Sequence, residues 1–260
     1  MATKLPTLKD LIDAGAHFGH RRSRTYPKAK KFTYTLRDSV YVINVEQTLE
    51  YLEKAAKVAE EFAKENKTIL LVGTKAQATD LVKEVAQKAG IPFINHRWLG
   101  GTLSNFATIH SNLSKLKTLT ELSESERFAE FTKKERGRIT KQIAKLTKVF
   151  DGIRDLDRIP DLMIVVDINE EDIAVTEARG AGVPVIGIVD TNSNPDLVNY
   201  PIPANDDSKK TISLILNVLT DAIAEGKKAA PAVTKAEADP KATKAEKVAA
   251  ATKKEEKDGN

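Results

Sequence analysis

One order of residues occurs twice in the chain and restricts its fold more than any other feature. Residues 67–74 (KTILLVGT) form a short apolar run that precedes a segment of helical spacing and a second apolar run, IPFIN. Residues 160–168 (PDLMIVVDI) begin the same order again, which ends in VPVIGIVDT. Strands that are apolar along their whole length and alternate with helices are typical of parallel sheets covered on both faces, with right-handed crossovers. The sequence therefore predicts an α/β fold.

The two predicted helices end alike. Each closes on Ala-Gly, at Gly90 and at Gly182, and a proline stands two residues later, at Pro92 and Pro184. Glycine adopts the left-handed conformation that ends many helices, and proline is tolerated where a strand begins. These residues predict where each helix stops and where the next strand starts.

Two further segments extend the predicted body. Residues 40–45 (VYVINV) predict a strand that adds a unit to the sheet, and a helix with one apolar stripe follows it. A stripe of the same kind predicts a last helix over residues 208–224. We expect the body to comprise residues 1–102 and 156–225.

The segment between the two repeats, residues 103–155, has a different periodicity. Its apolar residues step by three and four in two groups, separated by the charged stretch LSESERFAEFTKKERGR. The seam residues are Phe106, Ile109, Leu113 and Leu116 in one group and Ile139, Ile143, Leu146, Phe150 and Ile153 in the other. This heptad spacing predicts two antiparallel helices that pair as a protruding coiled-coil arm. The alternative is two ordinary helices that lie on the body.

Residues 226–260 contain mainly Ala, Lys, Glu, Thr and Pro and have no sustained apolar period. Such a segment cannot bury enough apolar surface to offset the entropy lost on ordering. We expect a disordered charged tail.

The composition excludes several classes of protein. The chain has 41 Lys and Arg against 37 Asp and Glu, so its net charge of +4 says less than the local distribution of charge. It contains no cysteine, which excludes disulfides and thiolate metal sites. The start lacks the apolar core of a signal peptide, and no stretch approaches the ~18 apolar residues of a membrane-spanning helix. We expect a cytoplasmic protein that does not enter a membrane.

The most basic segment of the chain runs from His20 to Arg37, HRRSRTYPKAKKFTYTLR. Its cations are Arg21, Arg22, Arg24, Lys28, Lys30, Lys31 and Arg37, and its aromatic residues are Tyr26, Phe32 and Tyr34. Basic groups release counterions from phosphates, and aromatic rings can stack on unpaired bases. Because no carboxylate in the segment compensates its charge, an anionic partner is favoured. The segment predicts an RNA-binding surface; the alternative is a solvated basic loop.

A second candidate site follows the strand predicted at IPFIN. The segment INHRWLGGTLSNF combines Arg97, the only tryptophan (Trp98) and the pair Gly100 and Gly101. Such a tight loop lets backbone approach a phosphate or a neighbouring strand. It matches neither G-x-G-x-x-G nor the Walker pattern, and VGTKA lacks a full phosphate cradle. Nucleotide binding is therefore poorly supported, and packing best explains Gly73.

Scattered histidine and aspartate residues form a third candidate site. Asp190 follows a predicted parallel strand, at the edge where doubly wound folds bind ligands. With His17 or His20 and with Asp206 or Asp207 it could bind zinc or magnesium. The commoner alternative is that such residues cap helices, with Asp206 or Asp207 as the N-cap of the last helix. Spacing alone favours the caps.

Seven motifs span nearly all of Leu5 to Ala224: GAHFGHRRSRTYPKAKKF, VYVINVEQT, INHRWLGGTLSNF, FTKKE, PDLMIVVD, AVTEARGAGVPVIGIVDTNSNPD and IPANDDS. Together they resemble the S-two family of bacterial small-subunit ribosomal proteins. The resemblance implies a Rossmann-like or flavodoxin-like parallel sheet with helices on both faces and an inserted coiled-coil hairpin. It implies a structural constituent of the small subunit and no catalysis.

The resemblance also implies partners. Members of the family contact small-subunit ribosomal RNA near the head–body junction and help to dock the large mRNA-binding ribosomal protein built from OB-fold repeats. No homo-oligomer is expected. Contact with RNA would fall on the basic segment, on Arg97 and Trp98, and on Lys133 and Lys134 at the tip of the arm.

A metal ion is also associated with some members of the family. By resemblance, its ligands would be His20, Asp190 and Asp206 or Asp207. Zinc or magnesium would be the ion, and no cofactor is required.

Two other classes of function stay open. A nucleotide-dependent enzyme could use the same fold, although the sequence lacks a phosphate motif, an acid/base pair and a cysteine nucleophile. A protein-interaction scaffold could recruit a partner through the arm. The behaviour of the protein away from RNA distinguishes the scaffold from the ribosomal protein.

Overall fold

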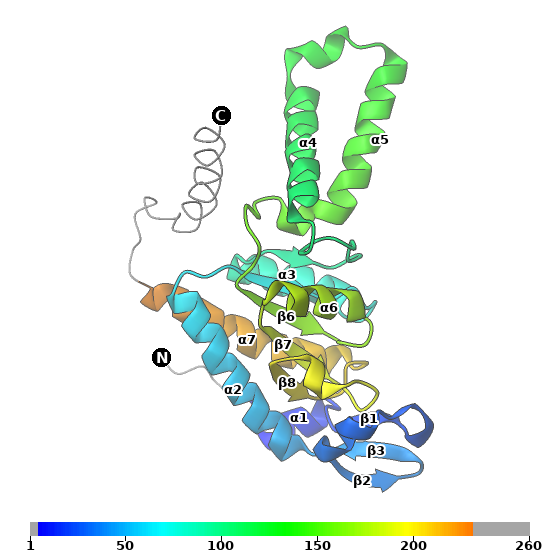
Figure 1. The fold of residues 1–260 in the computed structure, drawn as a ribbon, viewed down its shortest axis with the longest axis vertical. Coiled ribbons are helices and arrows are strands. Elements are labelled where there is room, and N and C mark those ends of the chain that lie inside the picture. The colour runs from blue at the N-terminus through cyan, green and yellow to red at the C-terminus, as the bar shows by residue number, and fades with distance from the viewer. Residues whose placement is uncertain (1–4, 231–260) are drawn as a thin grey trace, which may run out of the picture. The chain divides into compact units, whose positions relative to one another are not determined.

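The computed structural model describes residues 5–230, in which five parallel strands form the central sheet (Figure 1). Their order is β5–β4–β6–β7–β8, and every neighbouring pair is parallel. The strands are β4 (Ile69–Val72), β5 (Phe93–Ile94), β6 (Leu162–Val166), β7 (Val185–Val189) and β8 (Tyr200–Pro203). Helices flank this sheet, which confirms the predicted α/β class and is consistent with a Rossmann-like fold.

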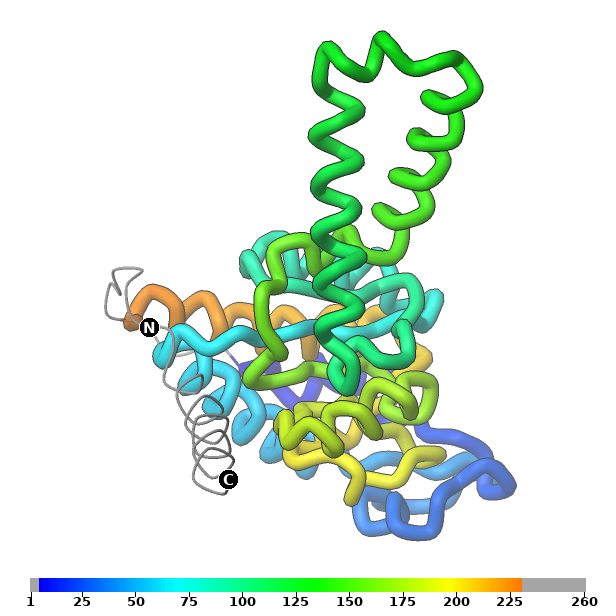
Figure 2. Tube along the Cα trace, turned by 45° about the horizontal axis from the view of Figure 1, so that its top comes forward, coloured from blue at the N-terminus to red at the C-terminus, as the bar shows by residue number. Residues whose placement is uncertain are grey.

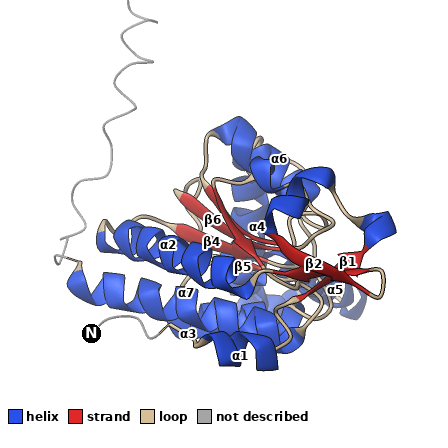
Figure 3. Cartoon of the chain, turned by 90° about the horizontal axis from the view of Figure 1, so that it is seen from below, coloured by secondary structure: helices blue, strands red, loops and turns tan. Residues whose placement is uncertain are grey.

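Alternate residues of the central strands build two separate cores. The flanking helices are α2 (Val45–Lys64), α3 (Thr79–Ala89), α4 (Phe106–Glu124), α5 (Lys133–Phe150), α6 (Asp172–Ala181) and α7 (Lys209–Ala229). Ile69 and Leu71 of β4 belong to the core with α2, α3 and α7, whereas Leu70 and Val72 belong to the core with α6 and the lower turns of α4 and α5 (Figure 3). Burial on both faces explains why these strands are apolar along their whole length.

The helix ends follow the predicted glycines. Gly90 ends α3 with a φ of 60°, and Gly182 ends α6 with a φ of 71°, both in the left-handed region. The N–H of each glycine donates to carbonyl groups of the last helical turn. The prediction from the Ala-Gly pattern is confirmed in both places.

The strand predicted over residues 40–45 forms but lies outside the parallel sheet. β3 (Val40–Ile43) is the middle strand of an antiparallel sheet with β1 (Phe18–Arg21) and β2 (Thr33–Arg37). Asp38 and Ser39 connect β2 to β3 with positive φ at both residues (49° and 65°), the conformation of a tight hairpin turn. The prediction that this strand extends the parallel sheet is wrong, because the turn pairs it with its neighbour in sequence.

The sequence patterns do not predict β1 and β2, nor two further short elements. One is α1 (Leu8–Asp13), which begins at a capping box between Thr7 and Asp10. The other is β8, which contains Pro201 and Pro203. Proline argues against a central strand, but β8 lies at the edge of the sheet, where it is tolerated.

The predicted arm forms as two helices, α4 and α5, joined at the far end by η3 (Glu126–Glu130) (Figure 2). Their lower turns belong to the core, since Leu113, Leu116 and Phe150 are buried there. Ile143 and Leu146 of α5 are only partly buried. Burial along a full-length seam is therefore not observed, and the coiled coil stays a prediction.

The last described helix is longer than the sequence predicts. α7 continues to Ala229, and Gly226 is buried within it, so the helix runs beyond its predicted end at residue 224. Gly226 packs against the backbone of Glu60 in α2, where a side chain would collide, so this close contact requires glycine. The predicted tail comprises residues 226–260: its first residues, 226–229, belong to α7, and its part from residue 231 onward lies outside the described residues. No helix within residues 5–230 has the length and apolar character needed to cross a bilayer.

Candidate nucleic-acid interface

The basic segment is an ordered unit rather than a loop. Its elements are β1, η1 (Arg22–Arg24), η2 (Pro27–Phe32) and β2. The Tyr26 N–H donates to the Thr191 carbonyl oxygen over 2.8 Å, and the His20 N–H donates to Thr191 Oγ1 over 2.7 Å, which attaches the segment to the turn after β7. Phe32 is buried, with its ring edge-on to that of Tyr51 in α2. The cations are therefore carried on a fixed scaffold.

The cations of the basic segment are all exposed, but a distant carboxylate pairs with two of them. Asp196, in η5 (Pro195–Leu197), lies 2.8 Å from Lys28 Nζ and 3.2 Å from Lys31 Nζ. Hydrogen bonds from these lysines lower the pKa of Asp196, and the bond to Asp196 raises the pKa of Lys28. The expectation that the segment's charge is uncompensated is therefore wrong for this pair, because the carboxylate comes from the turn before β8.

The other cations of the segment differ in how free they are. Arg37 Nε lies 3.8 Å from the neighbouring Asp38 carboxylate, and both side chains are almost fully exposed. Tyr34 is 75 % exposed and offers an open ring. Four cations have no ion pair with any residue in the range 5–230, and these are Arg21, Arg22, Arg24 and Lys30. Uncompensated positive charge is thus concentrated at the end of β1 and in η1.

A buried ionic network occupies the carboxyl ends of the parallel strands. Lys75, after β4, places Nζ 3.0 Å from Asp167 Oδ2, 2.7 Å from Asp206 Oδ1 and 2.7 Å from Asp207 Oδ1. Burial lowers the pKa of Lys75, but hydrogen bonds to Asp206 and Asp207 raise it by more, so the lysine stays charged. Burial raises the pKa of Asp206 to about 7, and the carboxylates of Asp167 and Asp190 add to the rise.

His20 and Asp190 belong to the same network. His20 Nδ1 lies 3.1 Å from Asp190 Oδ1, and its Nε2 lies 3.7 Å from Asp207 Oδ2. The contact with Asp190 raises the pKa of His20. The structure thus brings together His20, Asp190, Asp206 and Asp207 at the edge of the sheet where the sequence predicts them.

This network does not fit a metal ion as it stands. Within residues 5–230, no group of three or more His, Cys, Asp or Glu side chains is arranged to hold one. The ammonium group of Lys75 lies among the carboxylates, at the position where a cation would neutralise them. The prediction of an aspartate cap is wrong, because the N-cap of α7 is Ser208, which accepts from the Thr211 N–H. The aspartates pair with an internal cation instead.

The VGTK turn that carries Lys75 has no free phosphate cradle. The Thr74 N–H donates to Glu171 Oε1 over 2.6 Å, and Lys75 is committed to the network. A Cβ at Gly73 would lie 3.0 Å from Val82 and 3.1 Å from Val166, so packing explains this glycine. The Thr74 N–H and the Lys75 ammonium group are therefore not available to a nucleotide phosphate.

The turn after β5 is closed by an internal carboxylate. Glu177 of α6 accepts hydrogen bonds from the backbone N–H groups of Gly101 (2.7 Å), Leu103 (2.9 Å) and Ser104 (3.3 Å). The Trp98 indole N–H donates to the same carboxylate over 3.4 Å. Burial raises the pKa of Glu177, but the backbone donors lower it by more. The backbone N–H groups of Gly101, Leu103 and Ser104 are thus occupied by the protein's own anion.

Arg97 and Trp98 lie in opposite environments within this turn. Trp98 is 8 % exposed and packs in the core with Leu103 and Ile109. Arg97 is exposed. Stacking of the Trp98 ring on a base is not open in this arrangement, so its burial supports a packing role. Arg97 is the accessible cation of the turn.

Lys133 and Lys134 lie far from the basic segment. Both are exposed in the first turn of α5, where Thr132 and Glu135 form a capping box. Figure 1 shows that this turn is at the outer end of the hairpin, whereas β1 and β2 are at the opposite side of the body. The predicted RNA contacts therefore do not form one patch.

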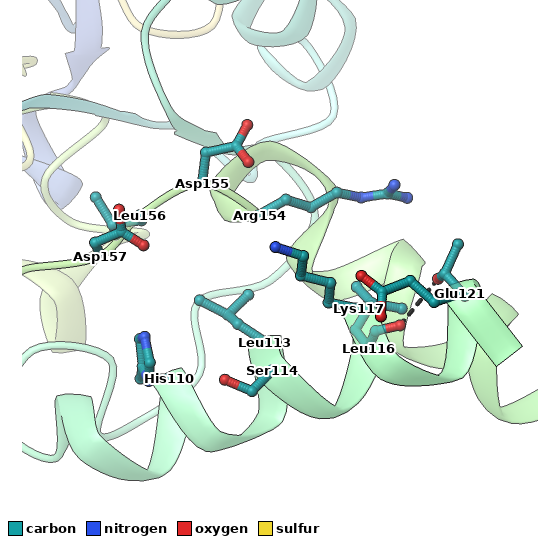
Figure 4. A pocket seen from close by; sticks show the side chains of 11 residues that line it. His110, Leu113, Ser114, Leu116, Lys117, Glu121, Arg154, Asp155, Leu156 and Asp157 are labelled. Carbon is teal, nitrogen blue, oxygen red and sulfur yellow. Dashed lines mark hydrogen bonds between the residues drawn. The ribbon is translucent and has the colours of Figure 1, made fainter.

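A cavity of about 460 Å³ lies between α4 and the turn that follows η4 (Asp151–Ile153) (Figure 4). Its lining includes His110, Lys117, Glu121, Arg154, Asp155 and Asp157. Both signs of charge are present, and Arg154 also pairs with Asp151 at 3.1 Å. The lining favours neither an anion nor a cation, and it contains none of the residues predicted to bind RNA.

The fold and the site together define an α/β protein that carries exposed, unpaired cations on an ordered scaffold. The family model of ribosomal protein S2 matches residues 11–226. The chain belongs to this family of structural proteins, which are not enzymes. The resemblance noted from the sequence motifs is confirmed.

Curated relatives agree with this assignment over most of their length. The small ribosomal subunit protein uS2 of Coprothermobacter proteolyticus is 43% identical over 231 residues, which cover 89% of this chain and 86% of the relative. That of Nocardia farcinica is 44% identical, with coverages of 89% and 81%. That of Dictyoglomus thermophilum is 45% identical, with coverages of 85% and 89%.

Sequence reasoning missed three residues that shape the site: Lys75, Glu177 and Asp196. Lys75 stands in VGTKA, a motif weighed only as a phosphate cradle. Its position after a parallel strand, with aspartates after the other strands, was a usable signal. Glu177 and Asp196 act over 73 or more residues of sequence, and no local pattern marks either of them.

Proposed function

We propose that this chain is a structural constituent of the small ribosomal subunit that binds small-subunit ribosomal RNA and supports translation. Its relatives are named as proteins of that subunit. Its location is the bacterial cytoplasm, where the small subunit works. The observation that carries the RNA assignment is the set of exposed, unpaired cations at the end of β1 and in η1.

These cations suit the phosphates of RNA better than its bases. Arg21, Arg22 and Arg24 project from a scaffold fixed to the turn after β7, so little ordering is needed before they meet a backbone. Arginine binds phosphate through two parallel N–H donors. Tyr34 adds an exposed ring for one unpaired base. Affinity would come from charge and shape, with little reading of sequence.

Residues 103–155 would form the predicted coiled-coil hairpin. We assign this hairpin to contacts at the head–body junction. Lys133 and Lys134 at its tip would meet RNA. Ile139, Ile143 and Leu146, which are partly buried, would form the seam with α4. The chain would also help to dock the OB-repeat mRNA-binding ribosomal protein. We expect no homo-oligomer.

The test of the RNA assignment is the salt dependence of binding. A triple variant, Arg21→Ala, Arg22→Ala and Arg24→Ala, should weaken binding to a small-subunit RNA fragment and reduce the slope of log K against log salt. Each lost phosphate contact is worth about 0.7 to 0.9 of slope. Filter binding at salt concentrations between about 50 and 300 mM, where counterion release dominates, measures this slope.

A matched control removes the same number of charges from α2. Lys54, Lys57 and Lys64 are each paired with a glutamate four residues earlier, so their change to Ala should leave the slope as it is. An equal loss of slope in both triple variants would mean that the basic segment contributes only through the overall charge of the protein. An unchanged slope in the arginine variant would sink the assignment.

Sedimentation separates this function from the scaffold alternative. The tagged protein should co-migrate with small subunits at moderate salt and be released by a high-salt wash. Migration as a free protein under both conditions would favour a scaffold that works away from RNA.

A further inference from the structure

The turn after β5 is organised by a single side chain from another part of the chain. Both carboxylate oxygens of Glu177 are used: Oε1 by Gly101 and Trp98, and Oε2 by Leu103 and Ser104. Four donors on one carboxylate form a more specific site than a helix cap or a surface ion pair. The turn therefore depends on an anion that the chain itself supplies.

The position of this carboxylate is fixed by the packing of α6. Ala174, Val175 and Ala178, which flank Glu177 on the helix, are buried in the core beneath the sheet. The receiving turn is equally constrained, because Gly101 has a φ of 93°, which side chains other than hydrogen rarely allow. Both halves of the contact are held before any partner arrives.

The contact separates two neighbouring residues. Its bond to the Trp98 indole holds this ring on the core side, where it is 8 % exposed. Arg97, one residue earlier, is left on the outside of the turn. Because Glu177 occupies the backbone N–H groups of Gly101, Leu103 and Ser104, the exposed guanidinium of Arg97 is the charged donor that the turn offers to a phosphate.

We propose that Glu177 is a positioning residue: it fixes the turn of residues 98–104 and thereby presents Arg97 to an RNA phosphate. The first step is a property of the free protein. The second step rests on the proposed function, because it needs RNA at this turn. The two steps can be measured separately.

Trp98 provides the measurement of the first step, since it is the chain's only tryptophan. Glu177→Gln keeps the size of the side chain but replaces one acceptor oxygen by an NH₂ group that faces backbone donors. We expect a red-shifted tryptophan emission, stronger quenching by acrylamide, and amide exchange at Gly101, Leu103 and Ser104 at least about tenfold faster. Unchanged emission and exchange would overturn the proposal.

The matched control is Glu170→Gln, the same chemical change at an exposed position just before α6. It should leave emission and exchange unchanged. If Glu177→Gln fails to fold, the native chain still supplies the test: its Trp98 emission should change on acidification as Glu177 takes up a proton. Emission that stays unchanged while the folded chain passes through the titration of Glu177 would also overturn the proposal.

RNA binding then tests the second step. Arg97→Ala and Glu177→Gln should each weaken binding, and the double variant should be no weaker than Arg97→Ala alone, because both act through the same guanidinium. One outcome would overturn only the presentation of Arg97: Glu177→Gln disturbs the turn but binds RNA normally, while the arginine triple variant binds RNA more weakly. Normal binding by the arginine triple variant and by Arg97→Ala would instead remove the proposed RNA function while the positioning of the turn stands.

Discussion

The carboxyl edge of the parallel sheet and the basic segment both hold dense charge, but they treat it in opposite ways. At the sheet edge, Lys75 is surrounded by carboxylates, and Glu177 by four donors. In the basic segment, Arg21, Arg22 and Arg24 face solvent without a partner in the described residues. One region is closed on itself, and the other is open.

The difference indicates where a partner can bind. In α/β folds ligands usually bind at the carboxyl edge of the sheet. Here the charged groups at that edge are paired within the protein, so they stabilise the fold. Exposed cations that repel one another cost stability and gain an offsetting term only when an anion arrives. We therefore propose that the binding site lies not at this edge but on the antiparallel unit of β1, β2 and β3.

The largest expected effect comes from removing the cation of the closed region. Lys75→Met would leave Asp167 and Asp206, 4 % and 0 % exposed, without a counter-charge. Breaking a buried ion pair from one side typically costs about 3–5 kcal/mol, because each remaining carboxylate must stay buried without its partner or take up a proton. We expect a loss of this size in the free energy of unfolding, measured by urea denaturation.

Lys28→Met is the matched control in the basic segment. It makes the same substitution and breaks an ion pair with Asp196, but both of these groups are exposed. Surface pairs contribute little, so we expect no measurable change in the free energy of unfolding. Equal losses in the two variants would erase the distinction between the regions, and a stable Lys75→Met would show that the network does not support the body.

The sequence predicts the fold where the periodicity is undisturbed. Continuous apolar strands gave the parallel sheet, and Gly90 and Gly182 gave the ends of two helices. β8 was not predicted, because Pro201 and Pro203 argue against a strand in the sequence pattern. The prediction for β3 failed because a strand pattern does not say which strand is its neighbour. The heptad spacing also left open how much of α4 lies in the core, and Leu113 is buried there.

The site was predictable only as far as its residue types. The run of cations is visible in the sequence, and the structure shows it exposed. Which of them are free is a tertiary property, decided by Asp196 from the turn before β8. The burial of Trp98 also follows from packing against α6, and no spacing announces it. Pairing between distant residues thus limits what a sequence pattern can say about function.

A smaller effect is expected when pH is changed through the titration of Glu177. The folded-state pKa of Glu177 lies below its unfolded value of about 4.3. Its ionised form therefore stabilises the fold fully above about pH 4.3, and this contribution is lost as pH falls through the folded-state pKa. Glu177→Gln should cost about 1.5 kcal/mol at pH 7, a typical value for hydrogen bonds to a charged group.

The measurement is the difference in unfolding free energy between the native chain and Glu177→Gln as pH is lowered. The difference should be constant above about pH 5 and shrink toward zero at lower pH. Glu170→Gln, at an exposed position without these donors, should show no such trend. A difference that stays constant into the acid range would mean that Glu177 acts by packing rather than by charge.

The smallest expected effect tests whether lysines that are paired within the protein can be made available to RNA. Asp196→Asn removes the carboxylate that pairs with Lys28 and Lys31 and keeps the size of the side chain. Both lysines then become free for phosphate, so binding to RNA should tighten and its salt slope should steepen by about 0.7 to 0.9 for each new contact. Because the pair is exposed, stability should not change. If RNA binding is unaltered, Lys28 and Lys31 are not part of the interface, which would then consist of the unpaired cations alone.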